Sequence, residues 1–315
     1  MVWVGSLLPY EQGAQVFKRI GKRLVGATSI LAAVWLAGCV HIPMQPALGH
    51  SAAYRSTPQP VKCETELARP DLTPVAEHGL SPQRITLLTW NIFKQSRSNW
   101  FTDFQQLSHN QDLLILQEAT MDESLDTALS TSTYHWLMTT AFYYQDNATG
   151  VLTASRVPST RHCALYANEP LIQIPKSILV STYSLAGTNQ RLLVANVHGI
   201  NFSLGLESYR DQFKALGTIL RDHAGPLILA GDFNTWSDDR QAVLDQLSKE
   251  LSLQRVEYES HHRITVFGNP IDHVYYRGLE LVQASSPHVS SSDHNPLLVT
   301  FKLIAAQQEH YAKNL

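Results

Sequence analysis

The sequence predicts an α/β fold of the α+β type, in which mixed β-sheets pack together and helices cover their outer faces. Strand-like segments outnumber helical ones, and many follow one another with no helix between them. That order excludes a purely parallel, doubly wound sheet. Of the 315 residues, 44% are hydrophobic and 16% are charged, as in ordinary globular proteins. No repeat or internal boundary interrupts residues 83–305, which we predict to be one domain followed by a tail, residues 306–315.

The predicted strands are apolar runs, and the predicted helices have apolar residues on one face. Tyr209, Phe213, Leu216 and Leu220 recur at helical spacing, for example. Acidic residues begin the segment 122–130, where the dipole of a helix favours them. In chain order we expect strand 84–92, helix 99–109, strand 112–119, helix 122–130, strands 135–144, 150–158, 177–185 and 191–200, helix 207–223, strand 226–234, helix 239–251, and strands 271–278, 279–284 and 295–303.

Residues 1–38 are predicted to be a lipoprotein-type signal peptide. A cationic cluster, Lys18 to Arg23, precedes an apolar run of about 15 residues, shorter than the roughly 20 that span a bilayer. The sequence Leu-Ala-Gly-Cys follows, so Cys39 is the expected lipidation site. The protein is then expected in the cell envelope, lipid-anchored and facing the periplasm. The stretch before the cationic cluster is long for a signal, which leaves three alternatives: translation from near Val16, an uncleaved anchor, or a cytoplasmic protein with a mis-called start.

Residues 39–82 are predicted to be a proline-rich tether between the anchor and the domain. Seven of the 15 prolines fall in this segment, and apolar periodicity is weak. Besides Cys39 the chain has only Cys63 and Cys163. An oxidising periplasm would allow these two to pair, and two free thiols are an equally good interpretation. Nothing in the sequence calls for an obligate protein partner.

Net charge argues against a tight, processive DNA-binding protein. Without residues 1–38 the chain keeps 20 basic and 26 acidic residues, a net charge of −6. Non-specific affinity for duplex DNA comes mainly from the neutralisation of phosphates by basic residues. A local basic patch is still compatible with this composition.

Polar side chains stand at the ends of several predicted strands. Singly, each has an ordinary interpretation as a turn residue or a solvated strand end, because Asp and Asn bond their own backbone in turns. Together they form a series in which acids, amides and imidazoles recur at the same kind of position. The series is Asn91, Glu118, His198, Asp232, Asn234, Asp272, His273, Asp293 and His294.

In this order the segments TWNI, LQEA, GVLTASRVP, NVHG, GDFNTW, IDHVYY and SSDHNPLLV resemble the endonuclease/exonuclease/phosphatase superfamily. Its members include type I deoxyribonucleases, abasic-site endonucleases, inositol-phosphate phosphatases and neutral sphingomyelinases. The resemblance covers about residues 84–302, and WNIFKQ, HGINFSLG, GDFNTWS and YRGL are closest to the YafD-like bacterial branch. It implies a four-layer sandwich of two mixed β-sheets flanked by helices, with a metal site where strand ends converge.

Hydrolysis of a phosphodiester needs a divalent cation, a base for water and donors for the developing charge. Mg²⁺, or Mn²⁺ in its place, prefers oxygen ligands, and we predict Glu118, Asn91 and Asp293 as the metal-binding residues. Three cysteines without a CxxC pair exclude a zinc-thiolate site.

The resemblance also implies the catalytic roles. Asp232 positions or deprotonates the attacking water, and Asn234 donates to the phosphoryl oxygen. His294 contacts the scissile phosphate while Asp272 orients its imidazole. His198 matches the residue that protonates the leaving oxygen in deoxyribonuclease-like members.

Two departures from the family pattern leave these groups intact. His273 replaces a common aromatic residue, and we predict that it points away from Asp272 and has a structural role. NVHG replaces Asn-Thr-His-Leu but keeps Asn196 and His198.

The substrate depends on loops, in which Asn201, Trp236 and Lys176 are the predicted substrate-binding residues. The preferred expectation is a nuclease-like, metal-dependent phosphodiester hydrolase acting on nucleic acid. A phospholipid or sphingomyelin-type phosphodiesterase or phosphatase at the membrane is the alternative, and a catalytically silent binding module is the third.

Overall fold

The computed structural model describes residues 40–43, 47–51, 62–67, 76–171, 173–203, 205–259 and 262–304. The chain forms two compact units, Met1–His41 and Ile42–Leu315. In the first unit the described part is the short strand β1 (Val40–His41). The predicted signal peptide with Cys39 and the predicted tail lie outside the described residues, and both stay predictions.

The second unit contains two large mixed sheets. In the first, the strands follow the order β5-β6-β4-β3-β16-β15, and β2 pairs with β5. The pair β3 and β4 is parallel, and the other pairs are antiparallel. Its strands are β2 (Ala47–His50), β3 (Ile85–Asn91), β4 (Leu113–Thr120), β5 (His135–Tyr144), β6 (Asn147–Ser155), β15 (Leu279–Ser285) and β16 (Leu297–Leu303).

The second sheet has six strands in the order β11-β14-β10-β9-β8-β7. Here β10 and β9 are parallel and the other pairs are antiparallel. Its strands are β7 (Arg161–Asn168), β8 (Pro175–Ser184), β9 (Arg191–His198), β10 (Leu227–Asp232), β11 (Gln254–Arg255) and β14 (Asp272–Arg277). A separate hairpin pairs β12 (Thr265–Val266) with β13 (Asn269–Pro270).

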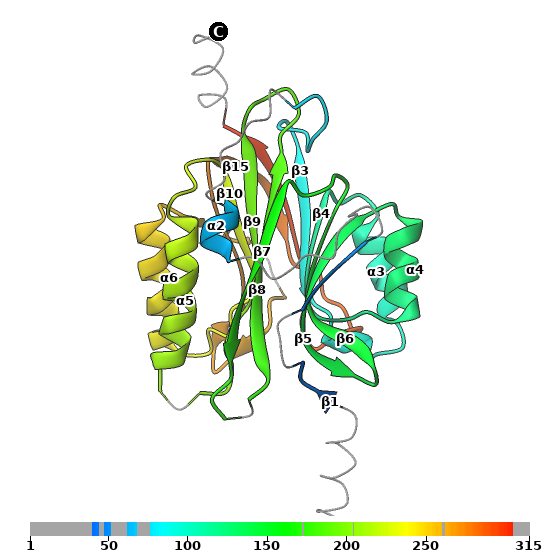
Figure 1. Ribbon diagram of the computed structural model, residues 1–315, viewed down its shortest axis with the longest axis vertical. Coiled ribbons are helices and arrows are strands. Elements are labelled where there is room, and N and C mark those ends of the chain that lie inside the picture. The colour runs from blue at the N-terminus through cyan, green and yellow to red at the C-terminus, as the bar shows by residue number, and fades with distance from the viewer. Residues whose placement is uncertain are drawn as a thin grey trace, which may run out of the picture. The chain divides into compact units, whose positions relative to one another are not determined.

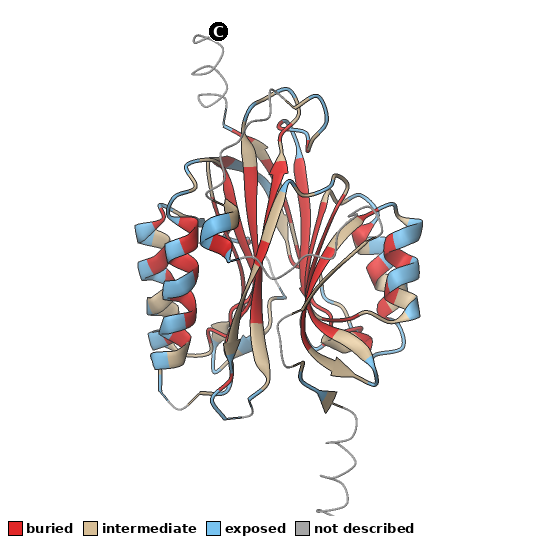
Figure 2. Cartoon of the chain, viewed as in Figure 1, coloured by how far each residue is buried: buried red, intermediate tan, exposed pale blue. Residues whose placement is uncertain are grey.

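The two sheets pack face to face, and helices cover both outer faces, which confirms the predicted four-layer sandwich (Figure 1). Between the sheets lies an apolar core to which both contribute, such as Leu87 and Ile115 from the first and Val194 and Ile228 from the second. On the first sheet lie α3 (Trp100–Ser108) and α4 (Glu123–Thr131), and on the second lie α2 (Cys63–Leu67), α5 (Glu207–Leu220) and α6 (Asp238–Glu250). Figure 2 shows the buried helix faces turned toward the sheets.

Local sequence explains where the helices begin. The side chain of Asp122 accepts a hydrogen bond from the backbone N–H of Leu125 at 2.9 Å and caps α4. Ser237 caps α6 through the N–H of Arg240. The four apolar residues that predicted helix α5 are all buried against the second sheet.

The structure differs from the sequence prediction in the short strands β11, β12 and β13, in strand β7 and in the predicted tether. Strand β7 was not predicted, because it lies at the edge of its sheet and Cys163 is its only buried residue. In the segment predicted to be a tether, β2 adds to the first sheet and α2 lies on the second, joined to β7 by a disulfide between Cys63 and Cys163. The other residues of that segment are partly outside the described ranges. Among the described residues, no helix is both long and apolar enough to cross a bilayer.

The disulfide is expected to stabilise this unit. Replacing Cys63 by Ser removes a covalent link across 100 residues and should lower the free energy of unfolding by about 2–4 kcal/mol in urea titrations. Dithiothreitol should destabilise the native protein by a similar amount and leave Cys63→Ser unaffected. An equal effect of the reductant on both proteins would contradict the assignment.

Candidate functional site

Strand registers bring the polar residues of both sheets to one end of the sandwich. In the first sheet Asn91 ends β3 opposite Gln117 of β4. In the second, Asp232 ends β10 with His198 on one side and Asp272 on the other. Sequence segments up to about 200 residues apart therefore meet, as the strand-end pattern predicted.

A buried amide holds the two sheets together beneath this end. Asn196 of β9 accepts a hydrogen bond from the Gln117 side chain of β4 at 2.8 Å. Its own amide donates to the carbonyl oxygens of Leu116 at 3.1 Å and Leu152 at 2.9 Å, both in the first sheet. The bonds cross between the sheets, so Asn196 fixes the spacing between β9 and β4.

Asp232 lies at the centre of the site and is almost fully buried. One carboxylate oxygen accepts from the Asn91 amide at 3.1 Å, and the other accepts from the backbone N–H of Asn234 at 3.0 Å. Burial raises the pKa of Asp232 to about 6; the charge of His294 opposes this rise and that of Asp272 adds to it. Asn234 adopts a left-handed backbone (φ 53°), and its amide donates to the Gly199 carbonyl at 3.0 Å. The second amide hydrogen of Asn234 has no bond among these contacts.

Gly231 allows β10 to deliver Asp232 at this position. Its φ is 140°, and a Cβ there would lie 2.1 Å from the Val197 carbonyl oxygen of the neighbouring strand. A side chain would push β10 away from β9, and Asp232 away from His198 with it.

His294 and Asp272 form the predicted carboxylate–histidine pair. The His294 Nδ1 lies 2.8 Å from an Asp272 carboxylate oxygen, and its Nε2 lies 3.9 Å from Asp232. Burial lowers the pKa of His294, but Asp272 and then Asp232 outweigh it and raise the pKa to about 10. At neutral pH this imidazole is cationic, so its Nε2 presents a proton toward Asp232.

His198 is engaged by a lysine. Its Nε2 lies 2.7 Å from the Lys176 ammonium, 3.7 Å from Asp232 and 3.9 Å from Glu118. Burial and then the charge of Lys176 lower the pKa of His198 well below its usual value. The imidazole is therefore neutral, and Lys176 is the donor in this contact. Lys176 in turn lies 3.7 Å from the fully buried Glu169.

Glu118 reaches the site from an irregularity in β4. The register shifts between Leu116 and Ala119, and Glu118 has a φ of 50°, so its side chain leaves the pleat of the strand. It forms an ion pair with Lys94. Burial raises the pKa of Glu118, but positive charge nearby, on His198 when it is protonated and on Lys94 and Lys176, lowers it to about 2. A carboxylate this acidic stays ionised across the whole pH range of interest.

The donor set suits a hard divalent cation, since carboxylates and an amide dominate it. Asn91 and Glu118 point to the site, as predicted, through their contacts with Asp232 and His198. The predicted ligand Asp293 is exposed, and its negative charge helps to raise the pKa of His294. Among the described residues, the trio whose ligand atoms lie within 4.8 Å of one another is Asp232, Asp272 and His294. Within this trio Asp272 and His294 already bond each other, and both carboxylate oxygens of Asp232 accept hydrogen bonds from Asn91 and Asn234.

Two predicted substrate-binding residues lie beside this centre, at its rim. The indole nitrogen of Trp236 donates to the Asn201 side chain at 3.1 Å, and both residues are partly exposed. Beneath them the buried Arg240 stacks on Trp236, with 4.3 Å between its guanidinium carbon and the ring centre. It also donates to the backbone oxygens of Asn201 and Asn234 at 3.0 Å.

His273 points away from Asp272, as predicted. Its Nε2 lies 2.7 Å from the Thr235 hydroxyl and 3.0 Å from the Pro270 carbonyl oxygen, and the ring packs on Phe233 and Tyr275. Burial lowers the pKa of His273 to about 3, so the ring is neutral.

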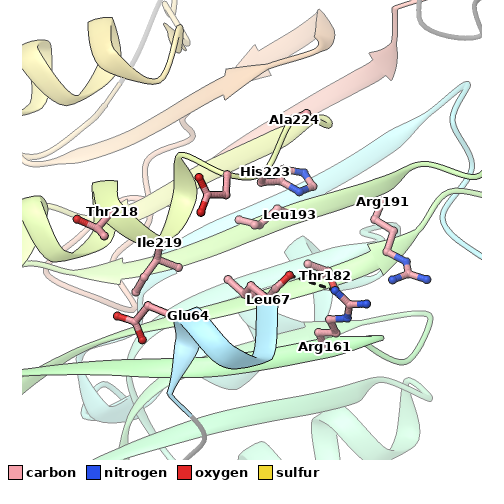
Figure 3. Close-up of a pocket in the computed structure, with 11 residues that line it drawn as sticks. Glu64, Leu67, Arg161, Thr182, Arg191, Leu193, Thr218, Ile219, His223 and Ala224 are labelled. Atoms are coloured by element: carbon pink, nitrogen blue, oxygen red, sulfur yellow. Dashed lines mark hydrogen bonds between the residues drawn. The ribbon is translucent and has the colours of Figure 1, made fainter. Parts of the chain in front are cut away.

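A cavity of about 520 Å³ lies elsewhere, among α2, β7, β8, β9 and the end of α5 (Figure 3). Arg161, Thr182 and Arg191 line it. Arg191 begins the strand that His198 ends, and seven residues of strand span about 23 Å. This cavity contains none of the predicted site residues.

Sequence reasoning missed Lys94, Glu169 and Arg240. Lys94 comes two residues after the TWNI segment, and that proximity was the available signal. Glu169 and Arg240 act through contacts with loops, which no periodicity reveals.

Similar proteins are known by sequence and by fold. A sequence model of the Endonuclease/Exonuclease/phosphatase family matches residues 88–294. A UPF0294 protein of Vibrio parahaemolyticus is 41% identical over 220 residues, which make up 70% of this chain and 78% of that protein. Another, of Vibrio vulnificus, is 38% identical over 264 residues, 84% of this chain and 90% of that protein.

Two solved structures share the fold at low identity. The human Nocturnin catalytic domain with bound sulfate is 18% identical, with a TM-score of 0.57 over 72% of this chain and 97% of that one. D. rerio TDP2 complexed with a single strand DNA product is 15% identical, with a TM-score of 0.52 over 70% of this chain and 99% of that one.

The buried His273 should make the protein sensitive to acid. The unfolded chain protonates this imidazole near pH 6.5 and the folded chain near pH 3, so the unfolded state binds more protons between these values. Stability from this residue is present above pH 6.5 and falls by about 1.4 kcal/mol per pH unit below it. His273→Phe, with a ring of similar shape, should flatten the pH dependence of the unfolding free energy by that slope. Parallel curves for the two proteins between pH 4 and 6.5 would show that His273 is protonated in the fold.

Proposed function

This chain belongs to the endonuclease/exonuclease/phosphatase family, and on that premise we propose that it is a divalent-metal-dependent phosphodiester hydrolase. Members of the family typically hydrolyse phosphoric esters. The observation that carries the proposal is the meeting of Asn91, His198 and His294 around the carboxylate of Asp232. An acid, an amide donor and imidazoles at one buried point are the groups that water attack on a phosphodiester needs.

A Mg²⁺ or Mn²⁺ ion held by Glu118 and Asn91 would neutralise a phosphate oxygen and so make the diester more susceptible to attack. Asp232 is the proposed base for the attacking water. Its two oxygens are fixed by Asn91 and the N–H of Asn234, so the carboxylate needs no reorganisation to accept a proton. The free hydrogen of the Asn234 amide is the proposed donor to the phosphoryl oxygen.

His294 is proposed to bind the scissile phosphate as a cation. Asp272 fixes the ring through Nδ1, and the Nε2 proton faces the same space as Asp232. A protonated imidazole at this point would stabilise the charge that builds up on the phosphoryl oxygens in the transition state.

The position predicted for the proton donor contains two groups. His198 is neutral and receives a hydrogen bond from the Lys176 ammonium, so the proton at this position belongs to the lysine. We propose that Lys176 and His198 serve together as the group that protonates the leaving oxygen. Lys176, predicted as a substrate-binding residue, would then act in the reaction itself.

Nucleic acid and phospholipid are the two proposed substrate classes. Similarity in fold to TDP2, whose structure holds a single strand DNA product, and the place of His198 support the first. Apolar loops beside the site support the second. The disulfide suits an oxidising compartment and so supports the proposed location in the cell envelope. A silent binding module is the alternative if no diester is turned over.

Asp232→Asn and Glu118→Gln should each lower kcat/KM for bis-p-nitrophenyl phosphate by about 10²–10⁴-fold, because they remove the base and the metal-binding carboxylate. The assay is p-nitrophenolate release with Mg²⁺ or Mn²⁺, and EDTA should abolish it. Glu280→Gln, an exposed carboxylate on β15 paired with Lys302, is the matched control and should retain full activity. Turnover that survives both site substitutions unchanged would contradict the mechanism, and no turnover by the native protein would favour the binding module.

Lys176→Met should lower kcat by about 10²–10⁴-fold. It should also raise the pKa of His198, because the Lys176 charge is one of the two main causes that lower it. Histidine side-chain NMR from pH 4 to 9 measures this pKa without reference to activity. Lys214→Met, an exposed lysine of α5, is the control. An unchanged titration of His198 would show that the Lys176 contact has no electrostatic effect on it.

A further inference from the structure

We propose that the tips of three loops beside the site form a docking surface for a phospholipid layer, so that the substrate is a phospholipid at a membrane surface. This inference rests on the proposed phosphodiester hydrolysis and names the substrate class. The docking surface is defined by Leu171, Phe202 and Phe267, with Trp236 at its base. Leu171, Phe202 and Phe267 are 55%, 52% and 87% exposed.

These side chains are half of the exposed large hydrophobic residues in the described ranges. Six large hydrophobic residues are exposed there, and three of the six lie on these loops. Single exposed hydrophobic residues are normal on a soluble protein, but a group at the mouth of a site indicates a binding surface.

The topology places all three tips at the end of the sandwich that holds the site. Leu171 lies in the turn between β7 and β8, and β8 begins at Pro175, one residue before Lys176. Phe202 follows the end of β9, four residues after His198. Phe267 is at the tip of the β12–β13 hairpin, which leads directly into Asp272 of β14.

Direct contacts connect the tips to one another and to the site. Phe267 packs edge-on against Trp236, with 6.3 Å between ring centres, and Trp236 bonds Asn201, the residue before Phe202. The Asn201 N–H donates at 2.8 Å to Glu169, which begins the turn that carries Leu171.

The same buried Glu169 lies 3.7 Å from Lys176, the lysine that contacts His198. The apolar tips and the proposed proton donor therefore share one scaffold, and a surface bound by the tips would lie against the site.

Charge decides between a lipid layer and a nucleic acid. Residues 169–175, 199–206 and 265–270 contain no lysine or arginine, and the chain without residues 1–38 has a net charge of −6. A protein that stacks single-stranded bases on aromatic rings also needs a cationic track for the phosphates. Apolar tips without cations suit an uncharged or zwitterionic interface, where aromatic rings settle at the boundary between head groups and acyl chains.

The scissile diester of a phospholipid lies at that boundary. Tips that enter the apolar layer would hold the site at the level of the head groups, where Asp232 and His294 could reach the phosphate. A soluble diester would not need the apolar side chains of the three loop tips to reach the site.

The test is binding of the body, residues 42–315, to phosphatidylcholine vesicles, measured by sedimentation at low and high salt. This part of the chain is a compact unit that contains all four buried apolar clusters, so it should fold alone. Phe202→Ser with Phe267→Ser should weaken binding on the order of tenfold for each ring removed. Phe202→Leu with Phe267→Leu should retain most of it, because a lipid layer requires apolarity and not aromaticity. Val282→Ser is the matched control, as Val282 is 56% exposed on β15, away from the three loops, and its loss should have no effect.

Each other outcome identifies a different occupant and overturns the inference. Suppose that the native body binds a single-stranded oligonucleotide but no vesicles, and that both the Ser and the Leu double variants lose the oligonucleotide binding. The tips would then be a platform for base stacking. A native dimer that the Ser variant dissociates in sedimentation velocity would make them an interface between copies. Hydrolysis of bis-p-nitrophenyl phosphate by the native body separates the proposed hydrolysis from the proposed docking surface. If the native body does not hydrolyse this diester, the proposed function fails. If it hydrolyses the diester but does not bind vesicles, only the docking surface fails.

Discussion

The hydrogen bonds of Asn196 across the two sheets are the constraint on which the site depends. Each sheet supplies only some of the functional groups, Asn91 and Glu118 from the first and His198, Asp232 and Asp272 from the second. A face-to-face sandwich packed by aliphatic side chains alone has little to prevent small slides of one sheet over the other. Asn196 binds the Gln117 side chain and two carbonyl oxygens of the opposite sheet, and so holds the strand ends in register to within the tolerance of a hydrogen bond. Leaving any of these buried groups unpaired would cost about 1–3 kcal/mol, which penalises a displaced arrangement.

The electrostatics of the site follow from this forced proximity. Acids and bases that would ionise independently in water share one buried space, and their charges alternate: Glu118 with Lys94, Lys176 with Glu169, His294 with Asp272. Asp232 stands among them with a raised pKa, while Glu118 is held strongly acidic. Environments that give two carboxyl groups very different pKa values are typical of sites where one carboxylate moves a proton and another binds a cation. The apolar loop tips lie outside this charged centre and are joined to it through Glu169.

Much of the fold and of the candidate site could be predicted from the sequence, because both leave patterns that can be recognised in the sequence without knowledge of the tertiary structure. Apolar runs and helical spacing located the long strands and helices, and the polar residues at strand ends identified Asp232, Asp272 and His294 as neighbours. Edge strand β7 and the short elements α2, β2 and β11 to β13 could not be predicted, since they bury too few side chains to leave a pattern. The neutral state of His198 depends on its burial and then on Lys176, which comes from a different strand, and the exposed position of Asp293 depends on a loop. Long-range contacts of this kind are set by packing and do not appear in local sequence.

The most direct test of the central claim, that these residues surround one cation, is a crystal structure with Mn²⁺ and an anomalous difference map at the manganese edge. The account predicts a strong peak within coordination distance of a Glu118 carboxylate oxygen, close to Asn91 and Asp232, with the Lys94 ammonium moved away from Glu118. A map without a peak between the two sheets' strand ends, or with Glu118 still paired to Lys94 and the ion bound elsewhere, would contradict it.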